Sequence, residues 1–134
     1  MLDLSSFNLS SIEEKVFHYF SEISSIPRGS GNREKIADYC EKYAQNLDLK
    51  YTRDSDNNIV VFKNGKNGGE NAEPIILQGH LDMVCQATEE CEIDFLNDGL
   101  EIYRDGDYIK AKGTTLGAAN GLAIAYIMAI LASN

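Results

Sequence analysis

The sequence predicts an α/β domain in which a mixed sheet is flanked by helices. Two amphipathic segments at the start, short apolar runs in the middle and an apolar segment near the end all favour this class. The 134 residues suffice for one domain, and 43% of them are hydrophobic. We therefore expect an ordered chain with a single core.

Apolar residues recur every three or four positions from residue 12 to 26, as on one face of a helix. They are Ile12, Val16, Tyr19, Ile23 and Ile26. Ser10 or Ser11 can cap this helix, and Pro27 ends it. After a turn at 28–32, a second helix is predicted, with its own apolar face. That face consists of Ile36, Cys40, Tyr43 and Leu47. Both helices are expected to lie on a sheet.

The middle of the chain predicts strands. The runs 59–62 and 75–77 are continuously apolar, which is typical of strands covered on both faces. Residues 50–53 predict a further strand, and the glycine-rich stretch 64–73 predicts a surface loop. Asp105-Gly106 predicts a hairpin turn between two more strands.

The segment 122–132 predicts a helix that is apolar on every side. Such a helix belongs in the interior of a domain larger than these residues form. We expect the chain to be a piece of a longer protein. Burial of the helix against another copy or another chain is the alternative.

Charge and cysteine usage exclude several classes. A net charge of −9 repels phosphate backbones, so a nucleic-acid partner is not expected. The three cysteines form no Cys-x-x-Cys pair, which favours reduced thiols in a cytoplasmic protein. The start of the chain does not resemble a signal peptide, and the longest apolar run is too short to cross a bilayer. A soluble, cytoplasmic protein without a membrane partner is expected.

His80 and Asp82 follow an apolar strand-like run and are two residues apart. On a strand this spacing places both side chains on one side, so an imidazole and a carboxylate can share a site. The imidazole could bind a metal ion while the carboxylate orients it. A hydrogen-bonded histidine at a strand end is an equally good interpretation.

Small residues dominate 113–121, immediately before the last helix. They allow a ligand to approach the backbone closely, but the segment lacks the Gly-Lys-Ser/Thr ending of a phosphate-binding loop. By itself, this segment is interpreted as an ordinary loop-to-helix junction.

Three segments together resemble a known family. They read Pro-Arg-Gly-Ser-Gly-Asn at 27–32, Gly-His-Leu-Asp-Met-Val at 79–84 and Gly-Thr-Thr-Leu-Gly-Ala at 113–118. In this order they are similar to the opening of the aminoacyl-histidine (carnosine-cleaving) dipeptidases. These dipeptidases form a group within the two-zinc aminopeptidases and carboxypeptidases. The resemblance covers nearly the whole chain.

The resemblance implies that His80 ligates zinc and that Asp82 is a catalytic-site carboxylate holding that histidine in place. It implies two zinc ions and a possible homodimer in the full-length enzyme. It also implies that residues 1–134 are the N-terminal portion of one α/β catalytic domain. The rest of that domain and the lid or dimerisation domain would then be absent.

Position 119 departs from the family pattern Gly-Ala-Asp-Asn-Gly, because Ala119 stands where an aspartate bridges both zinc ions. A methyl group cannot bind a metal, and the family's paired glutamates and remaining ligands would lie beyond residue 134. The other histidine, His18, is expected to be a surface or packing residue. We therefore expect weak zinc binding or none in this chain.

The resemblance implies metal-assisted hydrolysis of short peptides, with Xaa-His dipeptides as the preferred substrates. This chain is expected to be inactive because Ala119 removes the bridging ligand and the later ligands are missing. The alternatives are a non-catalytic truncated domain, a related tripeptidase or amino-acid deacylase, and an unrelated binding module.

Overall fold

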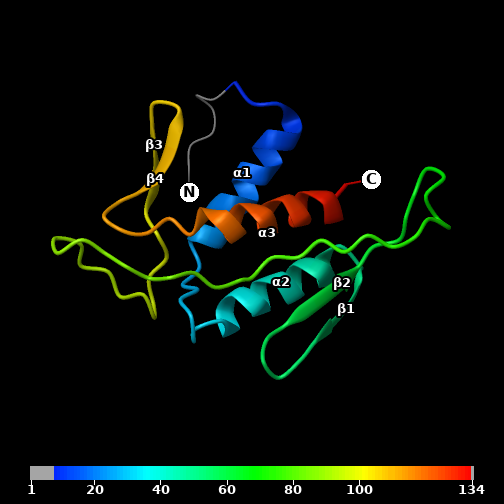
Figure 1. The fold of residues 1–134 in the computed structure, drawn as a ribbon, viewed down its shortest axis with the longest axis horizontal. Helices are drawn as coiled ribbons and strands as arrows, with labels where there is room; N and C mark the ends of the chain where they lie inside the picture. Colours follow the sequence, from blue (N-terminus) through cyan, green and yellow to red (C-terminus); the bar gives the residue numbers. More distant parts are fainter. Residues whose placement is uncertain (1–7, 134) are drawn as a thin grey trace.

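The computed structural model describes residues 8–133, in which two helices are followed by two small antiparallel sheets and a third helix (Figure 1). The elements are α1 (Ser11–Ser24), α2 (Glu34–Asn46), β1 (Lys50–Arg53), β2 (Ile59–Phe62), β3 (Ile102–Asp105), β4 (Tyr108–Ala111) and α3 (Ala118–Leu131). The predicted α/β class is confirmed. Within the described residues the strands pair as β1–β2 and β3–β4 rather than in one continuous sheet.

Helix α1 begins with a capping box. The Glu13 N–H donates to the Ser10 hydroxyl over 3.4 Å, and the Glu13 carboxylate accepts from the Ser10 N–H over 2.8 Å. Of the two serines predicted as caps, Ser10 is therefore the one that caps the helix. The helix ends at Ser24, before Pro27, as its sequence predicts.

The core lies where α1 packs against α3, with one residue from α2. Its buried members are Val16, Phe20, Ile23, Ile36, Ile124, Ala125 and Met128. The Tyr43 hydroxyl of α2 donates to the Met128 carbonyl of α3 over 2.8 Å, which joins the remaining helix to this pair.

The β1–β2 hairpin packs against α2 on one face only. Val60 is 52% exposed and Phe62 is 49% exposed on the other face. The expectation that 59–62 is covered on both faces is therefore wrong. Only one helix covers this two-stranded hairpin, so only the side chains on one face of the hairpin can be buried.

The strand expected at 75–77 does not form in the described part of the chain. These residues are extended but unpaired, and Ile75 and Ile76 are 86% and 90% exposed. Continuous apolarity predicts burial, but a strand also needs a neighbouring backbone to pair with its N–H and C=O groups. The stretch that follows β2 instead crosses the molecule as an extended chain (Figure 1).

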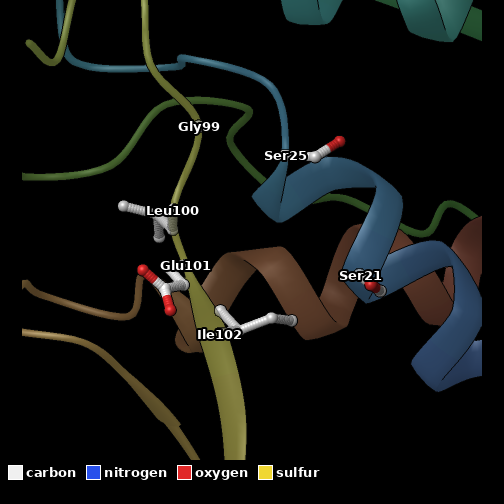
Figure 2. Close-up of a pocket in the computed structure, with 6 residues that line it drawn as sticks. All are labelled: Ser21, Ser25, Gly99, Leu100, Glu101 and Ile102. Carbon is white, nitrogen blue, oxygen red and sulfur yellow. The ribbon is translucent and has the colours of Figure 1, made fainter. Parts of the chain in front are cut away.

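The hairpin predicted at Asp105-Gly106 is confirmed. Asp105 pairs with Tyr108, and Gly106 occupies the first loop position with φ +61°, which glycine adopts without strain. The segment leading into β3 lies along α1, where the Leu100 N–H donates to the Ser24 carbonyl over 2.7 Å. Figure 2 shows the pocket of about 300 Å³ between them; it is lined by Ser21, Ser25, Gly99, Leu100, Glu101 and Ile102.

Helix α3 confirms the predicted apolar helix and is buried on one side. Ile124, Ala125 and Met128 face the core, whereas Tyr126 and Ile130 are 54% and 47% exposed. None of the helices within residues 8–133 has the length and apolarity needed to span a membrane.

Candidate functional site

A short backbone bridge places the segment of His80 and Asp82 beside the end of α1. The Met83 N–H donates to the Arg28 carbonyl over 2.9 Å, and the Ser30 N–H donates to the Met83 carbonyl over 3.2 Å. Gly29 and Met83 thereby form a parallel β-bridge. A Cβ at Gly29 would lie 2.9 Å from the Cys85 sulfur, so a larger residue here would require the Cys85 side chain to shift.

His80 and Asp82 contact each other, as their spacing predicts. The His80 Nδ1 lies 2.8 Å from the main-chain oxygen of Asp82 and 3.3 Å from its carboxylate Oδ1. When Nδ1 carries the proton it donates to these oxygens, and the Nε2 lone pair is left for a ligand. The imidazole is 61% exposed, so a ligand can reach it.

The Asp82 carboxylate is itself held from a third segment. Its Oδ2 accepts from the Ser30 hydroxyl over 2.7 Å. This hydrogen bond is the main cause that lowers the pKa of Asp82, and the nearby His80 and Arg33 side chains also lower it. The lowered pKa keeps Asp82 ionised at neutral pH, with its carboxylate 3.3 Å from the imidazole.

The first turn of α3 reaches His80 through Asn120. The His80 main-chain N–H donates to the Asn120 side-chain oxygen over 3.0 Å. Ala119 lies next to Asn120 in the first turn of α3 and is exposed. The fold thus brings together all three predicted site positions, His80, Asp82 and the stretch that contains Ala119. The roles of these residues in catalysis and metal binding stay predictions.

Sequence reasoning missed the contributions of Arg28, Ser30 and Asn120. Arg28 is buried, with 2% of its surface exposed, and Ser30 holds Asp82. For Arg28 and Ser30 the only signal in the sequence was the Pro-Arg-Gly-Ser-Gly-Asn segment at 27–32, which helped to define the resemblance without indicating a structural role.

The described residues do not complete a metal site. Within residues 8–133, nowhere do three or more histidine, cysteine, aspartate or glutamate side chains gather as a metal ion requires. Structural and catalytic zinc sites use three or four protein ligands, so this donor set does not fit a resident zinc ion. His18 pairs with Glu22 on α1 at 3.6 Å, consistent with the surface role expected for it.

A hollow of about 310 Å³ lies beside Ser30. Its lining consists of Gly29, Ser30, Asn32, Met83, Val84, Cys85, Phe95 and Leu96. It is mostly apolar and adjoins the segment that holds Asp82. The pocket in Figure 2 is different, because its lining includes neither His80 nor Asp82 nor Ala119.

In fold and in sequence, the chain is similar to dipeptidases. It is 40% identical to the cytosol non-specific dipeptidase of Escherichia coli (strain K12) over 119 residues, which are 89% of this chain and 24% of the relative. It superposes on the crystal structure of aminoacylhistidine dipeptidase from Vibrio alginolyticus with a TM-score of 0.86 and 38% identity. That match covers 92% of this chain and 26% of the other. No protein-family profile matches the chain.

The resemblance to the aminoacyl-histidine dipeptidases is therefore confirmed over the part that the comparisons cover. The chain spans about a quarter of the length of each of these two proteins. The fold shared with the solved structure consists of the helices and small antiparallel sheets described above.

Proposed function

We propose that this chain supplies the His80 portion of a zinc site in a dipeptidase that acts on short peptides in the cytoplasm. The observation that carries the proposal is the joining of His80 to both Asp82 and the start of α3, where the family pattern places a bridging aspartate. The similarity to two dipeptidases supports the same reaction class.

In this proposal, Asp82 holds the imidazole through Nδ1 and leaves Nε2 directed to the metal site. With the missing ligands supplied, His80 would be one of the residues that hold a zinc ion, which would lower the pKa of bound water and polarise a peptide carbonyl. Ala119 offers no oxygen ligand at the bridging position. We therefore propose that the chain as given is catalytically silent and needs further ligands from elsewhere.

Two substrate preferences follow from the two relatives. Preference for Xaa-His dipeptides agrees with the name of the structural neighbour, aminoacylhistidine dipeptidase. Broad dipeptide specificity agrees with the name of the sequence relative, a non-specific dipeptidase. A dipeptide panel that varies the second residue separates them in a complete enzyme carrying these residues.

Zinc calorimetry on the chain as given and on its Ala119→Asp variant tests the site. We expect zinc to bind the aspartate variant more tightly, because this substitution adds a carboxylate ligand beside His80. His80→Ala in that background should abolish the gain. His18→Ala, the matched control, removes a histidine remote from the site and should leave the gain intact.

Four outcomes would contradict the proposal. Equal tight binding by the chain and by Ala119→Asp would place the metal elsewhere, and binding that survives His80→Ala would do the same. Absence of binding in both proteins would show that His80 and position 119 do not form a metal site within these 134 residues. Zinc-dependent hydrolysis of a dipeptide by the chain as given would refute its inactivity.

A further inference from the structure

We propose that Arg28 is a positioning residue that sets the separation between the His80–Asp82 segment and the start of α3. This inference rests on the proposed function, because those two segments carry the proposed metal ligands. Arg28 lies in neither segment and acts on both through their main chains.

The guanidinium contacts one carbonyl from each segment. Its Nη1 donates to the Leu81 carbonyl over 3.3 Å, and its Nη2 donates to the Gly117 carbonyl over 3.0 Å. Leu81 lies between His80 and Asp82 in the chain, and Gly117 is the N-cap of α3. A single rigid, planar group therefore spans two segments that are far apart in sequence.

Glycines form the space that the guanidinium fills. A Cβ on Gly117 would lie 2.8 Å from Nη2, and a Cβ on Gly121 would lie 2.9 Å from the same atom. Gly117, the N-cap of α3, also has φ +62°, which glycine adopts without strain. Two glycines one helical turn apart thus accommodate the guanidinium at the start of this helix.

Burying the charged side chain of Arg28 costs free energy, which favours a specific structural role for this residue. Only 2% of the residue is exposed, and its Nε has no hydrogen-bond partner within the described residues. Burial is the main cause that lowers the pKa of Arg28, while Cys85 and Asp82 nearby favour its charged form. A buried apolar side chain would fill the same volume without this desolvation cost, but it could not bond two carbonyls.

The test compares Arg28→Met with Arg53→Met, both in the Ala119→Asp chain. Arg53→Met is the matched control because it removes the same charge from a residue that pairs with Asp38 and Glu41, away from the site. The first measurement is amide hydrogen exchange at His80, whose N–H is held by Asn120. The reference amides are Ala37 and Leu47 of the α2 region, which donate to Arg33 and Tyr43.

We expect Arg28→Met to speed amide exchange at His80 by at least about tenfold relative to the reference amides. In the variant, local opening of this segment no longer has to break the two Arg28 hydrogen bonds, so it occurs more often. We also expect zinc affinity to fall by about 10- to 100-fold, the usual effect of losing an orienting contact. Arg53→Met should change neither the exchange rate at His80 nor the zinc affinity. Arg28→Lys keeps the charge but replaces the two separate donor nitrogens of the rigid guanidinium by one, so His80 should again exchange faster.

Unchanged exchange and unchanged zinc affinity in Arg28→Met would overturn the inference. Equal acceleration at His80, Ala37 and Leu47 would also overturn it, since Arg28 would then only stabilise the whole fold. If Arg28→Met does not fold, Arg28→Lys decides by the same two criteria. Failure of the proposed function is distinguishable, because zinc would then fail to bind the Ala119→Asp parent itself.

Discussion

At the scale of single residues, the candidate site depends on small polar side chains that hold larger ones. The Ser30 hydroxyl donates to Asp82, whose carboxylate faces the His80 imidazole. A carboxylate that accepts such a bond is favoured in its charged form, so its folded pKa lies below the ordinary value of 3.8. Asp82 therefore contributes stability above its unfolded pKa and loses it as the pH falls through the folded pKa.

Ser30→Ala should raise the pKa of Asp82 toward its ordinary value, because the main interaction that lowers it is removed. The neutral-pH stability that Asp82 contributes should shrink accordingly. Carboxyl-carbon NMR during an acid titration measures the midpoint. Ser10→Ala is the matched control, since it removes the hydroxyl bond that is the main cause lowering the pKa of Glu13 and should leave Asp82 unaffected. An unmoved Asp82 midpoint in Ser30→Ala would refute this account.

At the scale of elements, the start of α3 is defined by close packing rather than by a capping side chain. Gly117 adopts φ +62°, and a Cβ there would lie 2.8 Å from both Arg28 Nη2 and Met83 Sδ. The turn between β3 and β4 uses Gly106 at nearly the same angle, φ +61°, but a Cβ there would meet nothing within 4 Å. Comparing alanine substitutions at these two glycines therefore separates the free-energy cost of backbone strain from that of steric overlap.

Gly106→Ala should lower the free energy of unfolding by about 1–2 kcal/mol, the cost of a left-handed conformation for a residue with a Cβ. Gly117→Ala should cost about 2–5 kcal/mol, because overpacking adds to the same backbone cost. Urea unfolding followed by circular dichroism measures both. Equal losses in the two variants would mean that the contacts around Gly117 are easily rearranged.

At the scale of the whole molecule, the described residues leave a continuous apolar stretch uncovered. Ile75 and Ile76 are 86% and 90% exposed, and Leu77 is 51% exposed. Scattered exposed hydrophobic residues are ordinary, but adjacent ones form a patch that binds other apolar molecules. Figure 1 shows this stretch as an extended chain outside both sheets.

Replacing Ile75 and Ile76 together by threonine should lower the fluorescence of an apolar dye bound to the folded chain. Thermal stability should change little, because these side chains bury almost no surface. Ile12→Thr is the control, since Ile12 is 67% exposed on α1. It should leave dye binding nearly unchanged. Undiminished dye binding in the double variant would place the apolar surface elsewhere.

Much of the local structure could be predicted from the sequence. The spacing of apolar residues predicted α1 and α2, the pair Ser10-Ser11 predicted the cap, and Asp105-Gly106 predicted the hairpin. The order of three motifs predicted the resemblance to dipeptidases. These features depend on neighbours within a few residues or on residue identity alone, which a sequence states directly.

Only the tertiary structure decided the contacts between distant segments. It left 75–77 unpaired, buried Arg28 between the carbonyls of Leu81 and Gly117, and joined His80 to Asn120. Pairing, burial and a bond across 40 or more residues depend on where the chain returns, and apolar periodicity carries no information on that. His80 and Asp82 were evident in the sequence as a pair, but their place beside α3 was set by packing.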